Sequence, residues 1–205
     1  MADRVRIIGG SWRGRWLDVA EMPGLRPTGD RVRETLFNWL QNDIGASCCL
    51  DLFAGSGALG FEAASRGASE VHLVEHAAHV CDALKTQSSQ LTKPSGNANT
   101  PSRYANTASV SVHCADSLAI LGQPPGAGPV KLPAADIIFV DPPFSLKLQQ
   151  QVLLLLSQND WLKSQALVYI EMERAEIKSM LPEKWAIHRE QSAGGVTFGL
   201  VYFSG

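Results

Sequence analysis

Short apolar runs alternate along the chain with longer segments in which apolar residues recur every three or four positions. The run at 137–140, Ile-Ile-Phe-Val, is apolar at every position, which is typical of a strand buried on both faces of a parallel sheet. A different segment carries an apolar stripe at helical spacing, made of Val32, Leu36, Phe37 and Leu40. We predict a helix there, capped by Thr28 or Asp30 and stopped by Gly45.

The rest of the chain continues this alternation. One predicted strand ends at Asp51, and the others cover 70–75, 109–114, 137–140 and 166–172. One predicted helix ends at Gly67, and two more cover 77–91 and 147–157. A final strand pair, 185–191 and 196–203, flanks Gly194-Gly195 and is expected to be antiparallel. The pattern indicates an α/β fold: a doubly wound, mainly parallel sheet with an antiparallel C-terminal hairpin.

We divide the chain into two parts. Residues 1–24 are assigned to a short N-terminal β-hairpin extension, and residues 25–205 to one Rossmann-like domain. Two segments, 92–108 and 122–133, are rich in small and polar residues, glycine or proline, and are predicted to be exposed insertions.

The N-terminal segment 1–33 differs in charge from the rest. The whole chain has a net charge of −2, but this segment holds seven arginines, no lysine and four acids, a net +3. Guanidinium groups bind phosphates in a bidentate way, and flat rings stack on bases. We predict a hairpin turning at Gly9-Gly10 that contacts nucleic acid through Arg4, Arg6, Arg13 and Arg15, interleaved with Trp12 and Trp16. The alternative is a solvated hairpin whose tryptophans pack onto the main domain.

Arg31 and Arg33 lie near the start of the first predicted helix, where the helix dipole disfavours cations. This position favours contact with an anion, although solvated surface arginines fit the sequence nearly as well.

Cysteine and histidine spacing predicts no metal site. Cys48, Cys49, Cys81 and Cys114 form no C-x-x-C motif, and none of them supports a zinc site at the cluster His72, His76 and His79. No apolar run approaches the length needed to cross a bilayer, and the N-terminus lacks the apolar core of a signal peptide. We therefore expect a cytoplasmic protein with no metal and no membrane partner.

A glycine-rich turn follows the first predicted strand. Gly55-Ser-Gly-Ala-Leu-Gly60 matches the G-x-G-x-x-G fingerprint of dinucleotide sites, and Glu75 lies twenty residues after Gly55. A hydride-transferring oxidoreductase is therefore one interpretation. However, Asp51 lies four residues before Gly55, where its carboxylate would repel a pyrophosphate bound at the helix N-terminus. The same carboxylate would attract the sulfonium and ammonium groups of S-adenosylmethionine.

We therefore predict S-adenosylmethionine as the cofactor. The glycines allow close backbone approach, so that N–H groups of the turn can bind the carboxylate of the cofactor. Glu75, which ends the second strand, suits the two ribose hydroxyls. Asp116, just after the third strand, would accept a hydrogen bond from the adenine amino group or would cap a helix, and the sequence favours neither role.

The strand at 137–140 leads directly into Asp141-Pro-Pro-Phe144. Neither proline can donate to a strand ladder, and each restricts the residue before it to extended geometry. Ligands of open α/β sheets bind at the carboxyl ends of strands. We predict a rigid ledge that presents Asp141 and Phe144 to a ligand; the alternative is a turn that merely ends the strand.

Asp51-Leu-Phe-Ala-Gly-Ser-Gly57, the acid ending the second strand, and Asp141-Pro-Pro-Phe144 together resemble the motif set of class I methyltransferases acting on exocyclic amino nitrogens. The arginine-rich start, with Arg26-Pro-Thr28 and the residues after Asp30, is similar to one branch, the bacterial small-subunit ribosomal RNA guanine-N2 methyltransferases of the RsmD type. The resemblance covers nearly the whole chain. It implies a seven-stranded class I methyltransferase sheet and, as target, guanine 966 of 16S ribosomal RNA within the 30S subunit.

The resemblance also implies roles for individual residues. Catalysis is expected of Asp141, Pro142, Pro143 and Phe144. Cofactor binding is expected of Asp51, Phe53, Ala54, Gly55, Ser56, Gly57, Glu75, Ala115, Asp116 and Asp141. RNA binding is expected of Arg4, Arg6, Arg13, Arg15, Arg26, Thr28, Arg31 and Arg33.

Two other functions stay open. The same ledge motif serves adenine-N6 methylation of DNA or RNA, and a chain that had lost catalysis would be an RNA-binding module. Intact Asp51 and Asp141-Pro-Pro-Phe144 argue against the latter. Cytosine-C5 methylation needs a thiolate nucleophile, and the sequence places no cysteine near the ledge. We expect the protein to be a monomer.

Overall fold

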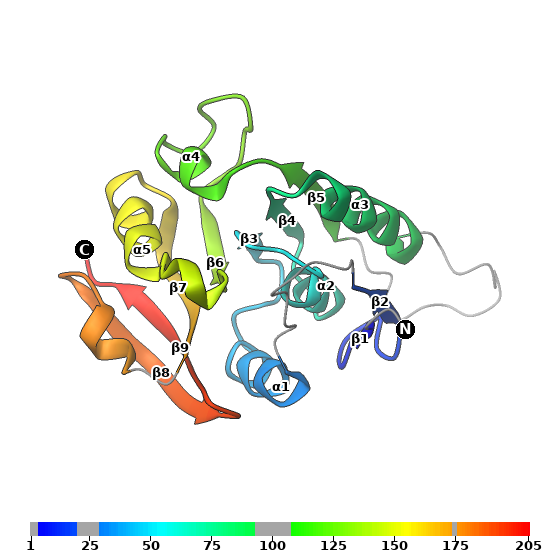
Figure 1. Cartoon of the computed structure of the whole chain (residues 1–205), viewed down its shortest axis with the longest axis horizontal. Helices are drawn as coiled ribbons and strands as arrows, with labels where there is room; N and C mark the ends of the chain where they lie inside the picture. Colours follow the sequence, from blue (N-terminus) through cyan, green and yellow to red (C-terminus); the bar gives the residue numbers. More distant parts are fainter. Residues whose placement is uncertain (1–3, 20–28, 93–107, 174–175) are drawn as a thin grey trace.

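The computed structural model describes residues 4–19, 29–92, 108–173 and 176–205. Its centre is a seven-stranded sheet (Figure 1) in the order β5-β4-β3-β6-β7-β9-β8. The strands are β3 (Cys48–Asp51), β4 (Glu70–Glu75), β5 (Ser109–Cys114), β6 (Ala135–Val140), β7 (Leu162–Glu173), β8 (Trp185–Ala193) and β9 (Val196–Phe203). The neighbours among β5, β4, β3, β6 and β7 pair in parallel, and β9 lies antiparallel between β7 and β8. The predicted fold class is confirmed.

Helices cover both faces of the sheet (Figure 1). One face carries α1 (Asp30–Trp39), α2 (Ala58–Ser65) and α3 (Ala78–Thr92), and the other carries α4 (Ser117–Leu121) and α5 (Gln149–Gln158). Two short 3-10 helices are also present: η1 (Phe144–Leu146) follows β6, and η2 (Ile177–Met180) follows β7. None of the helices within the described residues is long and apolar enough to cross a membrane.

The buried strands supply alternate residues to two apolar cores. In β6, Ile137 and Phe139 join the core with α1, α2 and α3, whereas Ile138 and Val140 join the core with α4 and α5. All four side chains are at most 1% exposed. This two-sided burial is the physical reason why the run at 137–140 contains no polar residue.

The first helix differs from the prediction at both ends. Its N-cap is Gly29, without a side-chain cap, and Asp30 is the first helical residue; its carboxylate binds Arg33. The helix ends at Trp39, well before Gly45. The predicted cap at Asp30 and the predicted stop at Gly45 are therefore wrong, while the other proposed cap, Thr28, lies outside the described residues.

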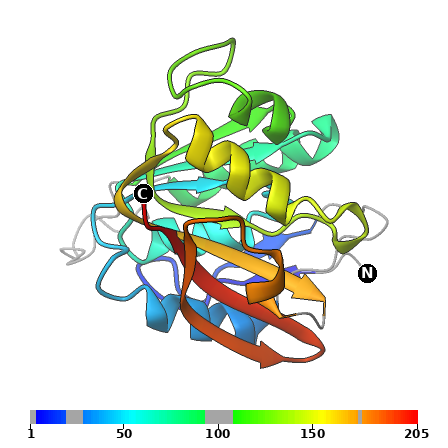
Figure 2. The same cartoon turned by 90° about the vertical axis from the view of Figure 1, so that its left-hand side faces the viewer.

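The antiparallel end of the sheet is formed by β8 and β9, which Figure 2 shows from their own side in orange and red. β8 is the outermost strand, and its register against β9 shifts between Ile187 and Arg189. The predicted hairpin around Gly194-Gly195 is confirmed.

The predicted N-terminal hairpin is present as a separate two-stranded sheet of β1 (Arg4–Arg6) and β2 (Trp16–Asp18). Its connection is longer than a turn at Gly9-Gly10, because Ile7 N–H still donates to the Arg15 carbonyl at 2.9 Å. Gly10 has φ +74°, and a Cβ there would collide with the Ser65 backbone. The loop thus docks closely on α2. The boundary at residue 24 lies outside the described residues, and the division into two parts stays a prediction.

The two predicted insertions are described to different extents. Residues 93–107 lie outside the described residues. The segment 122–133 has neither helix nor strand, as predicted, but it is held on the face with α4 and α5. Leu132 is buried there, and the Trp161 indole N–H donates to the Gln123 carbonyl at 2.9 Å.

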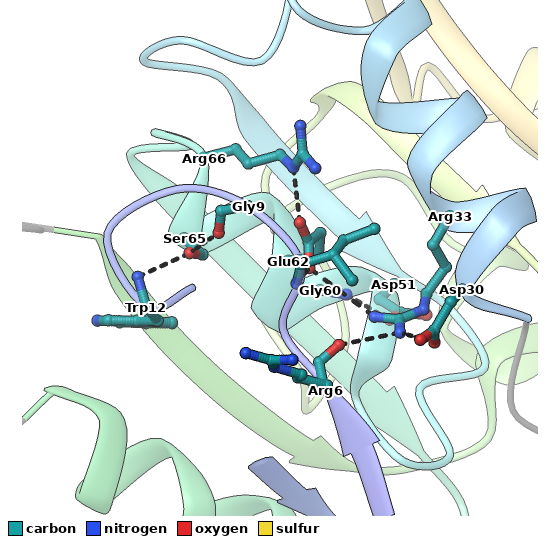
Figure 3. A network of polar contacts seen from close by, with 11 residues as sticks. Arg6, Gly9, Trp12, Asp30, Arg33, Asp51, Gly60, Glu62, Ser65 and Arg66 are labelled. Atoms are coloured by element: carbon teal, nitrogen blue, oxygen red, sulfur yellow. Dashed lines mark hydrogen bonds and ion pairs between the residues drawn. The ribbon is translucent and has the colours of Figure 1, made fainter. Parts of the chain in front are cut away.

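A buried ionic network fastens the hairpin to the main domain (Figure 3). The Glu62 carboxylate of α2 accepts from Ile8 N–H at 2.8 Å and pairs with Arg66 at 2.6 Å. The Arg33 guanidinium lies 3.8 Å from Glu62 and donates to Asp30 at 2.6 Å and to the Arg6 carbonyl at 3.0 Å. The side chains of Arg33 and Glu62 are both completely buried. Two helices and the hairpin therefore share one set of charges.

Replacing Glu62 by Gln should lower the free energy of unfolding by about 3 kcal/mol, because the Arg33 charge would stay buried with less compensation. Asp30 would still pair with Arg33, which keeps the loss at the lower end of the range for broken buried pairs. Urea unfolding followed by circular dichroism measures the change. Glu34→Gln, on the exposed side of α1, is the control and should change stability by less than about 0.5 kcal/mol. Equal effects of the two substitutions would contradict a stabilising network.

Candidate active site

Carboxylates from four adjacent strands gather at the carboxyl edge of the sheet. Asp51 ends β3, Glu75 ends β4, Asp141 follows β6, and Glu171 lies near the end of β7. The register places Asp51 beside Leu73 and Phe139, and Val140 beside Ile170. Residues of equal depth in parallel strands reach the same edge, so the predicted residues Asp51, Glu75 and Asp141 come together there.

The glycine turn between β3 and α2 is held by backbone hydrogen bonds. Leu52 N–H donates to the Phe139 carbonyl at 3.1 Å, and Ala54 N–H donates to the Val74 carbonyl at 3.0 Å. Gly57, with φ +75°, is the N-cap of α2. The predicted cofactor residues of this turn lie between the end of β3 and the start of α2: Phe53, Ala54, Gly55, Ser56 and Gly57. Phe53 is half-buried and the other four are buried.

Asp51 is buried beneath this turn and is only 1% exposed. Its Oδ2 accepts from the Gly60 N–H at 3.1 Å, a contact that helix α2 can make because position 60 has no side chain. Burial raises the pKa of Asp51 to about 7, and the charges of Asp141 and Glu75 add to the increase, against the hydrogen bond from Gly60. A nearby cation would reverse much of this penalty.

Glu75 connects β4 to the glycine turn. Its Oε2 accepts from Gly55 N–H at 3.1 Å, and its Oε1 accepts from Ala77 N–H at 2.8 Å and lies 3.0 Å from His76 Nδ1. A carboxylate oxygen offers about two acceptor positions, so Oε2 keeps one for a ligand hydroxyl. The exposed His76 would have to yield before Oε1 could bind a second hydroxyl.

Asp116 acts as the N-cap of α4. Its side chain accepts from Ala119 N–H at 2.8 Å, and the residue is exposed. Of the two roles left open by the sequence, the helix cap is present, and contact with adenine stays a prediction. Ala115 N–H donates to the Glu75 carbonyl at 3.0 Å, and the Ser117 hydroxyl donates to the Leu52 carbonyl, so this segment is tied to the turn.

The predicted ledge follows β6 directly. Asp141 is half-buried, Pro142 is buried and Pro143 is exposed, while Phe144 is half-buried and begins η1. The chain leaves the strand in a short 3-10 turn that ends at Lys147 in the left-handed region. The ledge therefore stands at the same edge as Asp51 and Glu75.

A buried tyrosine–glutamate pair beside the ledge was not predicted. The Tyr169 hydroxyl donates to Glu171 Oε2 at 2.8 Å, and Gln149 Nε2 donates to the Glu171 carbonyl at 3.0 Å. Burial raises the pKa of Tyr169 well above its usual value, and the charges of Glu171 and Asp141 raise it further. The signal was present in the sequence: Glu171 is the only charged residue in the run Ala166–Met172.

The predicted RNA-binding residues of the hairpin divide by their contacts. Arg4 pairs with Asp18 at 2.9 Å, and Arg15 donates to the Leu91 and Gln90 carbonyls of α3. Arg6 lies 5.9 Å from the centre of the Trp16 ring, and Trp16 is 57% exposed. Arg13 and Arg31 are exposed. Of the two tryptophans, Trp12 is buried in the core, as the structural alternative required.

Arg33 is a correction. It is 0% exposed and donates to Asp30 and to the Arg6 carbonyl, so the expected contact with RNA is wrong for this residue in this conformation. The anion near the helix start is a carboxylate of the protein itself. The remaining two candidates, Arg26 and Thr28, lie outside the described residues.

Comparison with known proteins finds similarity over nearly the whole chain. The family model described as Conserved hypothetical protein 95 matches residues 5–202. Ribosomal RNA small subunit methyltransferase D of Haemophilus influenzae is 44% identical over 196 residues, covering 96% of this chain and 92% of that protein. The protein of the same name from Escherichia coli K12 is 44% identical over 96% of this chain and 89% of its own length. A solved Escherichia coli chain, provisionally described as methyltransferase yhhF, is 41% identical with a TM-score of 0.77, covering 97% of both chains.

Asp51→Asn should remove a pH dependence of stability. The folded-state pKa of about 7 lies above the ordinary value of 3.8, so the wild type loses stability as the pH rises between these values. An uncharged Asn avoids this loss, and the variant should gain about 2–3 kcal/mol relative to the wild type between pH 5 and pH 8. Urea unfolding without cofactor at both pH values measures it, with the exposed Asp160→Asn as control. A difference that is the same at both pH values would contradict the raised pKa.

Proposed function

We propose a function from one premise: this chain belongs to the Conserved hypothetical protein 95 family, together with relatives named ribosomal RNA small subunit methyltransferase D. The protein is an S-adenosylmethionine-dependent methyltransferase that methylates the exocyclic N2 of a guanine in 16S ribosomal RNA. The observation that carries this proposal is the position of Asp141-Pro-Pro-Phe144, which follows β6 at the same edge as the buried carboxylates Asp51 and Glu75.

The residues at this edge fit S-adenosylmethionine in charge and in hydrogen bonding. Asp51 is buried with a raised pKa, so a cationic ligand would stabilise its ionised form. Glu75 keeps an acceptor position for a ribose hydroxyl beside the glycine turn. The turn brings backbone amides to the start of α2, where a ligand carboxylate is favoured by the helix dipole. Ala115 and Asp116 lie on the segment tied to Glu75, where we place the adenine side.

When bound, S-adenosylmethionine supplies an electrophilic methyl group on a sulfonium. The guanine 2-amino group is a poor nucleophile because its lone pair is delocalised into the ring. Asp141 and the Pro142 carbonyl would accept its two N–H groups, which favours pyramidalisation and frees the lone pair. This is stabilisation by acceptors placed in advance where charge develops. The two prolines keep these acceptors rigid.

Phe144 and the buried pair beside the ledge complete the proposed site. A half-buried aromatic ring next to Asp141 suits stacking of a base that has left its own stack. The hydrogen bonds from Tyr169 and Gln149 hold Glu171 in place, and the charge of Glu171 adds to the negative potential that favours a sulfonium. No strong general base is needed, because a methylated ammonium is highly acidic.

The hairpin would supply the contact to RNA. Arg6, Arg13 and Arg31 are exposed, and Trp16 presents a flat ring next to Arg6. We propose guanine 966 within the 30S subunit as the target, reached by a monomer in the cytoplasm. Arg4 and Arg15 would act partly by fixing the hairpin, through Asp18 and the end of α3.

Transfer of a labelled methyl group tests the proposal. The purified protein is incubated with labelled S-adenosylmethionine and either 30S particles from a strain lacking the enzyme, free 16S ribosomal RNA, or duplex DNA. Label on N2 of guanine in 30S particles is the expected result, and base analysis of the digested product identifies the atom. Label on N6 of adenine would favour the alternative methyltransferase, and no label in any substrate would contradict the enzymatic function.

Asp141→Ala should retain cofactor binding but lower the rate of methyl transfer by about 100- to 1000-fold, because an acceptor aimed at the reacting amine is lost. Titration calorimetry with S-adenosylmethionine and single-turnover methylation of 30S particles separate the two effects. Asp82→Ala, on the exposed surface of α3, is the control and should change neither quantity. If the substitution at Asp141 abolished cofactor binding, its proposed role would be wrong.

Replacing Arg6 and Arg13 together by Ala should weaken binding of 30S particles and reduce the salt slope of log K by about 1–2, because each lost phosphate contact releases one fewer counterion. Equilibrium binding over a range of salt concentrations measures the slope. Arg189→Ala on β8 is the matched control. An unchanged slope in the double variant would assign the hairpin a structural role only.

A further inference from the structure

The opposite edge of the sheet holds a second polar cluster. Cys48 is the first residue of β3 and pairs with Glu70, the first residue of β4. His72 lies two residues further along β4, so it shares a face with Glu70. The ligand atoms of these three residues, Sγ, a carboxylate oxygen and a ring nitrogen, all lie within 4.8 Å of one another. Cys48 and His72 are buried, while the Glu70 side chain is 46% exposed and leaves a path from solvent.

His72 is also held from behind by another histidine. Its Nε2 lies 3.0 Å from Glu70 Oε1, and its Nδ1 lies 3.0 Å from Nε2 of His113 on the neighbouring strand β5. Metal-binding histidines commonly use one ring nitrogen for the ion and hydrogen-bond through the other, which fixes the ring. The Glu70 carboxylate is on the Nε2 side of the ring, and His113 occupies the Nδ1 side.

We propose that Cys48, Glu70 and His72 form a binding site for a divalent cation of the zinc class, with His113 orienting His72. A thiolate, an imidazole and a carboxylate are the donor types that Zn²⁺ accepts, and three protein ligands leave a fourth position for water. Small movements of the side chains would place each ligand atom at about 2.0–2.3 Å from a zinc ion.

The charges around the cluster support a divalent ion. Asp136 on β6 accepts from the Cys48 N–H at 2.8 Å and pairs with Lys163 at 2.8 Å, so these two charges compensate each other. Glu70 and an ionised Cys48 would then carry two negative charges, which one divalent ion neutralises.

The cluster has an alternative state in which it holds no ion. His113 donates to His72, His72 donates to Glu70, and Cys48 stays a thiol. Binding of the ion breaks the S–H bond and forms a metal–sulfur bond, and the proton passes to the buffer. The histidines exchange tautomers without net loss of a proton. One proton is therefore released for each ion bound.

Sequence reasoning expected no metal because no cysteine stood near His72 in the chain. Pairing of β3 with β4 brings Cys48 next to it, so that argument fails for the folded protein. The cluster lies at the start of β3, whereas Asp51 ends the same strand at the edge with the proposed active site. The ion would therefore join β3 to β4 without taking part in methyl transfer, and the proposal does not depend on the proposed function.

Zinc titration of the full chain, in competition with a chromophoric chelator, tests the site. One ion should bind per chain, and Cys48→Ser and Glu70→Gln should each weaken the affinity by about 100-fold or more. The control is Cys114→Ser, because Cys114 is exposed and ends β5 at the other edge. Calorimetry in two buffers of different ionisation enthalpy should give one proton released per ion. Cobalt(II) should show a sulfur-to-metal charge-transfer band that Cys48→Ser abolishes.

Equal zinc affinity of the wild type and Cys48→Ser would overturn the proposal, because binding would then come from surface histidines. Absence of proton release, or a cobalt spectrum without the sulfur band, would overturn it as well. Circular dichroism of each variant without metal controls for folding, and Glu70→Gln tests the site even if Cys48→Ser is unstable, since Glu70 is half exposed.

Discussion

The close approach of α2 to β3 at Gly60 is the constraint on which the rest of the structure depends. A side chain at this position would collide with Leu73 and come tightly against Asp51, so only glycine lets the backbone N–H reach the Asp51 carboxylate. The remainder of α2 presents Glu62 and Ser65 to the hairpin. One eight-residue helix thus sets both the proposed cofactor turn and the position of the arginine-rich arm.

The described contact that holds the Asp51 carboxylate comes from a backbone amide rather than from a side-chain cation. The Glu75 carboxylate is held by two backbone amides and by the His76 ring. Amides orient a carboxylate but do not neutralise it, so the buried charge of Asp51 carries an electrostatic penalty. A ligand that brings a positive charge removes this penalty, whereas a pyrophosphate would increase it. The contacts of Asp51 and Glu75 therefore support the proposed sulfonium cofactor over a dinucleotide.

Local patterns were sufficient for most strands and for the longer helices, but not for the ends of α1, for α4 or for the contacts between elements. The apolar run at 137–140 and the glycine stop at Gly67, with φ +113°, were predictable because each depends on neighbouring residues. Arg33 was misjudged because its burial depends on Glu62 of another helix and on the Arg6 carbonyl of the hairpin. The link from Cys48 to His72 depends on strand register. The ledge could be predicted because its residues are consecutive in the sequence. The place of Glu171 beside the ledge depends on the pairing of β6 with β7.

The bond from Ile8 N–H to Glu62 joins residues 54 positions apart, and this separation has a consequence for synthesis. At about 5–20 residues per second, roughly 3–10 seconds pass between the appearance of the hairpin and that of α2. During this interval the arginine-rich arm has no α2 against which its buried residues can pack. Synthesis therefore leaves the arginine-rich arm without the helix that anchors it for several seconds.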